Sequence, residues 1–274
     1  LRTWPAVYGM FQPDAVATLR VRGDVFLLTA NEGDARVYPT SGSAFPGLGE
    51  GAVFNEEVRV NSGSYPLDPD VFPNATALKQ NDALGRLTVT NTLGRNGLGQ
   101  YERIYAFGAR SLSVWSPARL QPRTSATAPN AGLVWDSGAQ LEQITAALYP
   151  TRFNASNTNT TFDDRSDNKG PEPEGIVVGR VGPRDYAFVG LERIGGVMVY
   201  DVSNPIAPRF LQYVNTRSFG LDRLPGQDDS GAEGLTFVAA EDSPNGRPLL
   251  LVGNEVSQTL AIYEIERTKT KAPR

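Results

Sequence analysis

Three segments of this chain share one pattern, in which an acidic residue stands at each end of a predicted β-hairpin. The pairs of acids are Asp14 and Glu32, Glu174 and Glu192, and Glu233 and Glu255. The midpoints of the pairs are Gly23, Pro183 and Pro244, and each lies in a cluster of turn-forming residues. In an antiparallel hairpin, residues equidistant from the turn are neighbours. We therefore expect the acids to meet in pairs, once per repeat.

Neighbouring carboxylates repel each other unless a cation or a shared proton relieves the repulsion. The chain contains neither histidine nor cysteine, so zinc lacks its usual ligands, and Ser-His-Asp and Cys-His mechanisms are excluded. Any metal must be bound by oxygen, as calcium or magnesium prefers. The pattern predicts a metal site, with calcium as the first candidate, formed by Asp14, Glu32, Glu174, Glu192, Glu233 and Glu255.

An alternative explanation needs no metal. Each acid could accept hydrogen bonds from turn amides or pair with a nearby arginine, and thereby join one repeat to the next. The sequence leaves both explanations open.

Short apolar, β-branched and aromatic runs separated by Gly, Pro, Asn and Asp predict an all-β fold. The clearest unit has four predicted strands at 176–181, 186–191, 196–202 and 210–214, typical of one blade of a β-propeller. A second unit has strands at 235–239, 249–252 and 260–265, and a third at 15–21, 25–30 and 57–60. A divergent fourth unit covers 85–90 and 101–115. We expect about four blades, as part of a larger propeller.

The domain is predicted to span residues 1–266, followed by a short basic tail at 267–274. One short helix is expected at 142–149, and exposed loops at 39–50 and 116–131. In a propeller the first strand of each blade lines a central channel, so Asp14, Glu174 and Glu233 are expected to face one shared opening. The other three acids are expected just outside it.

Composition narrows the possible partners. The net charge is −4 and the chain has no concentrated block of Lys and Arg, which argues against nucleic acid as a partner. No apolar run approaches the roughly 20 residues needed to cross a bilayer, so we expect no membrane span. Three acceptor triplets for N-glycosylation, at Asn74, Asn154 and Asn159, would carry glycans if a eukaryote secretes the protein.

Several longer strings of sequence are specific enough to suggest a family. They are 29–36 (TANEGDAR), 84–87 (LGRL), 162–175 (FDDRSDNKGPEPEG), 190–193 (GLER), 195–202 (GGVMVYDV) and 243–255 (SPNGRPLLLVGNE). Together they resemble the choice-of-anchor I proteins, a family that includes mesenchyme-specific cell-surface glycoproteins and bacterial proteins described as alkaline phosphatases. The resemblance extends from about Met10 to Ile265. It implies an extracellular or surface β-propeller associated with calcium mineral or phosphate chemistry. Because members of this family are longer, the resemblance also implies that this chain is the C-terminal part of a propeller of about seven blades.

Four arginines fall close to the acids when the repeats are aligned: Arg36, Arg86, Arg110 and Arg193. Guanidinium groups suit both carboxylate and phosphate oxygens, so these side chains are candidate anion-binding groups and, equally, candidate ion-pair partners of the acids. The acidic stretch 163–170 resembles a calcium loop without the EF-hand spacing, and a solvated turn is its alternative.

Two hypotheses for function follow. The first is a calcium-binding propeller at the cell surface or outside the cell, in contact with matrix or surface-assembly proteins and with further blades upstream in the chain or in a second chain. The second is a metal-dependent phosphoesterase, in which bound cations polarise a phosphoryl group that Arg86 or Arg110 holds. No residue stands out as a nucleophile, which favours the first.

Overall fold

The computed structural model describes residues 3–38, 54–119, 132–219 and 228–266. Most regular structure in these ranges is β-sheet, which confirms the all-β class. The two α-helices are short: α1 spans Ala75–Leu78 and α2 spans Gln140–Leu148, the latter close to the helix expected at 142–149. A single 3-10 turn, η1, covers Pro117–Arg119.

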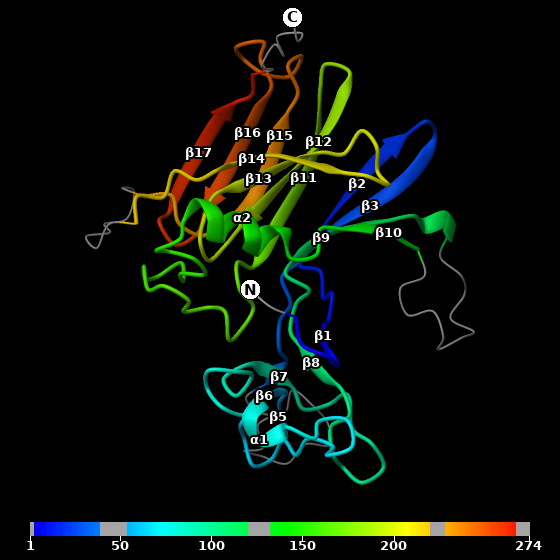
Figure 1. Ribbon diagram of the computed structural model, residues 1–274. Coiled ribbons are helices and arrows are strands. Elements are labelled where there is room, and N and C mark those ends of the chain that lie inside the picture. Colours follow the sequence, from blue (N-terminus) through cyan, green and yellow to red (C-terminus); the bar gives the residue numbers. More distant parts are fainter. Residues whose placement is uncertain (1–2, 39–53, 120–131, 220–227, 267–274) are drawn as a thin grey trace, which may run out of the picture.

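Three sheets form the upper body in Figure 1. The first has the order β10-β9-β3-β2, with β10 at Leu133–Asp136, β9 at Ser111–Trp115, β3 at Asp24–Asn31 and β2 at Ala15–Val21. The second has the order β11-β12-β13-β14, at Pro173–Val181, Arg184–Leu191, Val197–Asp201 and Arg209–Val214. The third has only three strands, β15-β16-β17, at Ala232–Val238, Leu249–Asn254 and Thr259–Glu264.

A smaller lobe lies below this body in Figure 1. Its sheet has the order β1-β8-β7-β6, at Val7–Gly9, Ile104–Ala106, Thr88–Thr90 and Glu57–Arg59. A two-stranded ladder pairs β4 (Val37–Tyr38) with β5 (Phe54–Asn55). Tyr65 and Tyr101 stack inside this lobe with ring centroids 3.6 Å apart, within a cluster of buried apolar side chains.

The predicted hairpins of the acid-bearing repeats are all present. In β2–β3 the pair Val21 and Asp24 closes a two-residue turn at Arg22 and Gly23. In β11–β12 the corresponding turn is Gly182 and Pro183, and in β15–β16 the connection covers 239–248. The midpoints inferred from the acid pairs therefore fall inside the three observed turns.

The assignment of strands to sheets was wrong in two places. The segment 57–60 does not extend the β2–β3 hairpin, because β6 pairs with β7 in the lower lobe, and β9 takes the place beside β3. The segment 101–115 is also divided between two sheets, with β8 below and β9 above. Arg110 lies between them with a φ of 57°, and this left-handed bend redirects the chain.

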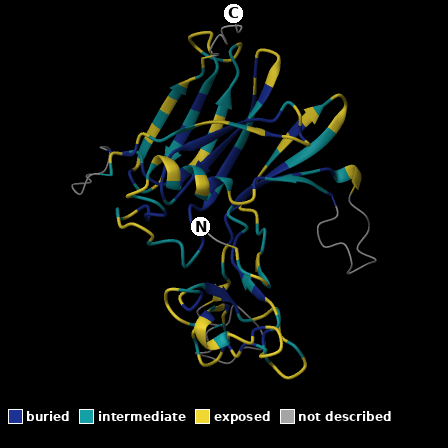
Figure 2. Cartoon of the chain, in the orientation of Figure 1, coloured by how far each residue is buried: buried dark blue, intermediate teal, exposed yellow. Residues whose placement is uncertain are grey.

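Strand β11 is the centre of the upper body, because β2 packs on one side of it and β15 on the other. A core that includes Leu28, Leu112 and Met198 fills the space between the first and second sheets, and a second core around Phe188 and Leu250 joins the second and third. Figure 2 shows this buried interior. The described strands form sheets that do not close into a ring, so the propeller and its number of blades remain predictions. The tail at 267–274 lies outside the described residues, as do 39–53 and 120–131, which include most of both expected loops.

Gly175 allows β11 to approach β15 closely. A Cβ atom at this position would lie 2.0 Å from the carbonyl oxygen of Glu233 and 2.5 Å from Leu235 Cδ1. Real Cβ atoms do not approach backbone oxygens this closely, so only glycine fits. The same close approach brings Glu174, the neighbour of Gly175, towards Glu233.

We predict that Gly175→Ala separates the second and third sheets. The free energy of unfolding should fall by about 1–3 kcal/mol, as for other overpacked interiors. Chemical denaturation monitored by circular dichroism measures this change. Gly97→Ala is the control, because a Cβ there meets nothing within 4 Å. Equal stability of the two variants would contradict the role given to Gly175.

Candidate functional site

The ends of the three hairpins converge, and the six predicted acids converge with them. Carboxylate oxygens of Asp14, Glu32 and Glu174 lie within 4.8 Å of one another. Glu174 is also repelled by the charges of Glu192 and Glu233. Burial, followed by the charges of Glu255 and Asp14, raises the pKa of Glu233. The structure therefore places the predicted acids near one another, and their role as metal ligands stays a prediction.

The pairing in two of the three hairpins is less regular than a simple midpoint rule suggests. The ladder shifts register between Pro173 and Ile176, and again between Ala232 and Gly234. Each irregularity lies beside an acid, at Glu174 and at Glu233. A β-bulge of this kind changes the direction of a side chain, which here brings carboxylates of separate sheets towards one centre.

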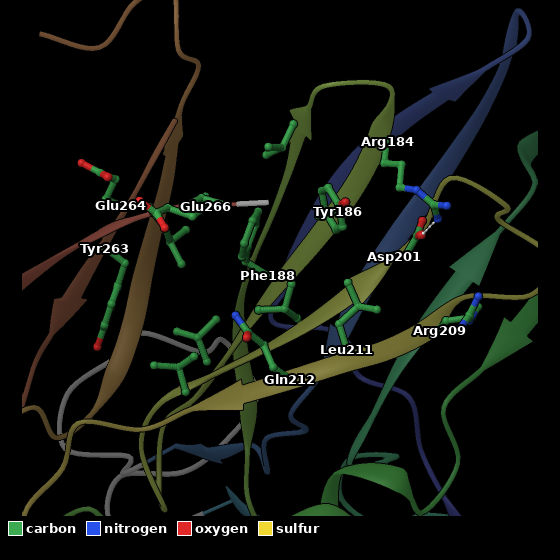
Figure 3. A pocket seen from close by; sticks show the side chains of 16 residues that line it. Arg184, Tyr186, Phe188, Asp201, Arg209, Leu211, Gln212, Tyr263, Glu264 and Glu266 are labelled. Carbon is green, nitrogen blue, oxygen red and sulfur yellow. Dashed lines mark hydrogen bonds and ion pairs between the residues drawn. The ribbon is translucent and has the colours of Figure 1, made fainter. Parts of the chain in front are cut away.

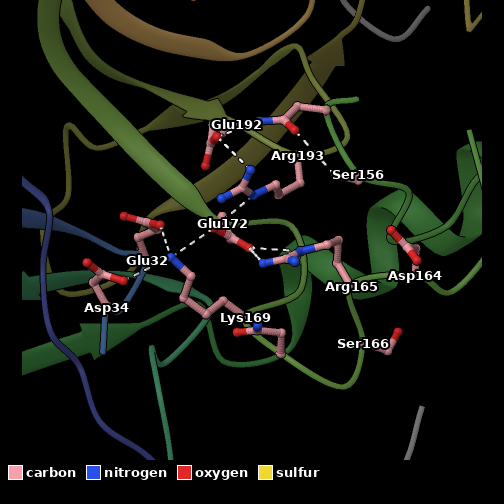
Figure 4. Close-up of polar contacts among 12 residues, drawn as sticks. Glu32, Asp34, Ser156, Asp164, Arg165, Ser166, Lys169, Glu172, Glu192 and Arg193 are labelled. Atoms are coloured by element: carbon pink, nitrogen blue, oxygen red, sulfur yellow. Dashed lines mark hydrogen bonds and ion pairs between the residues drawn. The ribbon is translucent and has the colours of Figure 1, made fainter. Parts of the chain in front are cut away.

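A group of cations lies against one side of the acids, around the fully buried Glu172 (Figure 4). Arg165 contacts Glu172 Oε1 at 2.6 Å, while Lys169 and Arg193 both contact Oε2 at 3.0 Å. Lys169 also pairs with Glu32, and Arg193 pairs with Glu192 at 3.0 Å. Glu172 is thus the centre of an ion-pair network that includes two of the six predicted acids.

The electrostatics of this network follow from burial and charge. Burial opposes ionisation of Glu172, but Lys169, Arg193 and Arg165 hold its pKa at about 2. Burial raises the pKa of Glu32 to about 7 in spite of Lys169, and the charge on Glu172 contributes to that rise. Burial likewise raises the pKa of Glu192 to about 6, against the lowering effect of Arg193. Within this network, Glu32 is therefore protonated more readily than Glu172.

The other four acids have no such compensation. Among the described residues, no lysine or arginine forms an ion pair with Asp14, Glu174, Glu233 or Glu255. Burial, followed by the charges of the surrounding acids, raises the pKa of Glu174 to about 8. Its Oε2 atom is buried and accepts no hydrogen bond from the described part of the chain. Near neutral pH, Glu174 must therefore hold a proton or meet a cation.

Each of the four predicted anion-binding arginines forms an ion pair with a carboxylate. Arg36 contacts Glu56 at 2.8 Å, Arg86 contacts Asp167 at 2.6 Å, and Arg110 contacts Glu142 at 3.0 Å. Only Arg193 pairs with a member of the predicted acidic ring. All four arginines thus form ion pairs, as one of the two interpretations of the sequence expected. Three of them pair with acids other than the six predicted ones.

The three glycosylation triplets lie in different surroundings. Asn74 is exposed beside the short helix α1. Asn154 is fully buried, and its amide nitrogen donates to Glu142 at 2.9 Å and to Ser166 at 2.8 Å. The amide nitrogen of Asn159 donates to Asp164 at 2.9 Å.

Sequence reasoning missed Glu172 and Lys169 as parts of the site. Both belong to the stretch 162–175 that was singled out for its resemblance, and Lys169 was included in the possible calcium loop at 163–170. A lysine that is only 8% exposed and an acid that is fully buried are unusual, since such groups are rarely buried unless paired. Sequence alone does not show burial. A signal was nevertheless present, because Arg165 and Lys169 closely precede Glu172 in the sequence.

These observations define a class: an all-β protein of repeated antiparallel hairpins, whose inner strands bring acidic residues of separate sheets to one centre. A family model for the choice-of-anchor I domain matches residues 1–205. The chain belongs to the choice-of-anchor I family.

Two relatives are similar to much of the chain. Gigasin-3a of Magallana gigas is 28% identical over 207 residues, which cover 71% of this chain and 69% of that protein. The mesenchyme-specific cell surface glycoprotein of Strongylocentrotus purpuratus is 27% identical over 222 residues, which cover 74% of this chain but only 27% of the relative. No solved structure matches the chain. In the described ranges, no helix has the length and apolar character needed to cross a membrane.

We predict that Glu172→Gln strongly destabilises the protein. The substitution leaves Arg165, Lys169 and Arg193 without their shared counter-charge, and breaking a buried ion pair costs about 3–5 kcal/mol. Urea denaturation at pH 7 measures the loss. Glu57→Gln, on the exposed face of β6, is the matched control and should change stability little. A small effect of Glu172→Gln would contradict the central role of this acid.

We also predict that stability falls as pH rises from about 5 to 8 in buffer without divalent cations. Glu174 has a pKa of about 8 in the folded state, above the usual value of 4.5, so the folded state binds more protons in this range. Deprotonation therefore favours unfolding. Thermal melting across this range measures the slope. Glu174→Gln should flatten it, and an unchanged slope would refute the assignment.

Proposed function

We propose that this protein binds a divalent cation at the centre of its three repeats, with calcium preferred to magnesium. Asp14, Glu32 and Glu174 form the inner ligand set, and Glu192, Glu233 and Glu255 complete it from the neighbouring strands. The observation that carries the proposal is the buried Oε2 atom of Glu174, which has no hydrogen-bond donor in the described structure and is surrounded by acids.

The spacing of the acids supports a cation of this size. Calcium binds oxygen at about 2.3–2.6 Å, so two ligand atoms on opposite sides of the ion lie about 5 Å apart. The carboxylate oxygens of Asp14, Glu32 and Glu174 all lie within 4.8 Å of one another, so one such ion could contact all three. Magnesium demands shorter distances and stricter geometry, which suits a group of flexible side chains from three segments less well.

The main competing explanation is a shared proton. The raised pKa values of Glu174 and Glu32 describe that state, in which protonation relieves repulsion without metal. A cation replaces the proton and restores ionisation of both groups, so calcium binding should release protons. This difference makes the two explanations separable by experiment.

The relatives suggest where such a site acts. One relative is named a cell surface glycoprotein, and we propose that this chain also works at the cell surface or outside the cell, within a matrix, biomineral or surface assembly. Calcium sites of extracellular modules have dissociation constants of about 10⁻⁴–10⁻³ M, an affinity that a partly exposed group of acids can reach. The proposed cation joins separate sheets, so its role is structural. Of the three acceptor triplets, exposed Asn74 is the best placed to carry a glycan.

We further propose that the sheets are blades of a β-propeller. The four-stranded order β11-β12-β13-β14, with the first strand innermost, supports this architecture. The adjacent positions of β2, β11 and β15 support it as well, because they correspond to the inner strands of successive blades. The intact propeller would need further blades.

No observation in the described residues favours the phosphoesterase hypothesis over cation binding. Arg86 pairs with Asp167, and Arg110 donates to Glu142 and to the backbone oxygen of Ser166 at 2.9 Å. Both guanidinium groups therefore already have a carboxylate partner. We propose a binding function rather than catalysis.

The test is calcium titration by isothermal calorimetry at pH 7.5 in two buffers of different ionisation enthalpy. We expect saturable binding with proton release, and a rise in melting temperature that follows from binding to the folded state alone. Glu174→Gln and Asp14→Asn should each weaken binding at least tenfold.

Asp24→Asn is the matched control, since Asp24 lies at the opposite end of the β2–β3 hairpin and should leave binding unchanged. Absence of any calcium-dependent heat or melting shift in the wild type would leave the shared proton as the explanation and overturn the proposal.

A further inference from the structure

The third sheet has a free edge where the second sheet has a fourth strand. Strands β11, β12 and β13 correspond in order and direction to β15, β16 and β17, but β13 pairs with β14, whereas β17 has no outer partner among the described residues. An unpaired edge presents a row of unsatisfied backbone groups and readily accepts another strand.

One hydrogen bond shows which backbone amides and carbonyls of β17 point away from β16. The amide of Ile265 donates to the carbonyl of Pro248 at 2.9 Å, so Ile265 points its backbone groups towards β16. Direction alternates along a strand, and therefore Leu260, Ile262 and Glu264 point their amides and carbonyls outward. These three residues form the outer hydrogen-bonding row of β17.

A groove lies directly beside this edge (Figure 3). It has a volume of about 550 Å³ and separates β14 from β17, with Leu211 and Val214 on one wall and Tyr263 on the other. Leu211 is 47% exposed although it is a large apolar residue in a strand. On the opposite face of the third sheet, Leu260 and Ile262 are 62% and 60% exposed. A single strand placed beside β17 would cover apolar side chains on both faces.

We propose that the outer edge of β17 binds an extended segment of a partner protein, which adds as a fourth strand and fills the groove. The backbone of the segment pairs with Leu260, Ile262 and Glu264. Alternate apolar side chains enter the groove against Leu211 and Val214, and the others lie beside Leu260 and Ile262. This inference is independent of the cation site.

Charge and space define the segment further. At one end of the groove Glu264 and Glu266 share a single arginine, Arg247, which leaves an excess of negative charge. A Lys or Arg at that end of the segment would complete the pairing. A second copy that adds its own β17 would bring a whole sheet with it, and β14 already occupies the far side of the groove. The space therefore suits one strand better than a sheet.

The test uses a fluorescent peptide with the sequence of 208–216 (PRFLQYVNT), because β14 is this chain's own strand at the corresponding place. A second probe is a peptide of alternating valine and threonine with a lysine at each end. We expect saturable binding of at least one peptide below about 1 mM, as for weak strand addition. The amides of Leu260, Ile262 and Glu264 should exchange with deuterium at least tenfold more slowly in the complex, as measured by NMR.

Three variants and a modified peptide make the test specific. Ile262→Pro removes an outward amide and the Ile262 side chain without breaking a hydrogen bond to β16, and it should abolish binding while circular dichroism and melting remain close to wild type. Leu211→Lys should weaken binding at least fivefold, whereas Ile206→Lys, at an equally exposed apolar residue outside the groove, should not. Peptides methylated at alternate backbone nitrogens should fail to bind.

Three results would overturn the proposal. They are no saturable binding of either peptide, binding without protection of the three outward amides, and a dimer in sedimentation that Ile262→Pro dissociates. The last result would identify a second copy as the occupant.

Discussion

Repulsion among carboxylates at the inner ends of β2, β11 and β15 is the constraint on which the remaining structure depends. The sheets pack because apolar side chains fill the space between them, and Gly175 removes the last obstacle to close approach of β11 and β15. The same packing forces acids from three hairpins together. Hydrophobic burial therefore provides the free energy that holds like charges close, and the site is strained electrostatically by the fold itself.

The chain compensates this repulsion on one side only. The six predicted acids and Glu172 outnumber the three cations Arg165, Lys169 and Arg193 by four charges if all of these acids ionise. Asp34, 3.7 Å from Lys169, adds a further carboxylate. The cations surround Glu172, where burial is complete and an unpaired charge would cost most. The uncompensated acids lie towards the more exposed side, where an ion from solution can reach them.

Parts of this arrangement could be predicted from sequence because they depend on local patterns. Turn residues at Gly23 and Pro183 determine which residues of a hairpin become neighbours, and this local rule identified the acid pairs. Sheet membership depends on long-range pairing instead, which is why β9 was wrongly grouped with β8 rather than with β3. The network around Glu172 was missed for a related reason. Its members lie in irregular segments or beside bulges. In such segments neither the helical nor the strand periodicity of hydrophobic residues predicts burial or the direction of a side chain.

The position of Glu174 connects the stability of the fold to the chemistry of the site. Its neighbour Gly175 fixes the approach of β11 to β15, and the bulge between Pro173 and Ile176 turns its carboxylate towards Asp14 and Glu32. A carboxylate with a pKa of about 8 opposes folding at neutral pH unless something positive binds it. Asp14 and Glu174 belong to different sheets, so the cation proposed above would link those sheets as well as neutralise the carboxylates. On that proposal, cation binding and cohesion of the repeats are one equilibrium, and the site stabilises the assembly only when it is occupied.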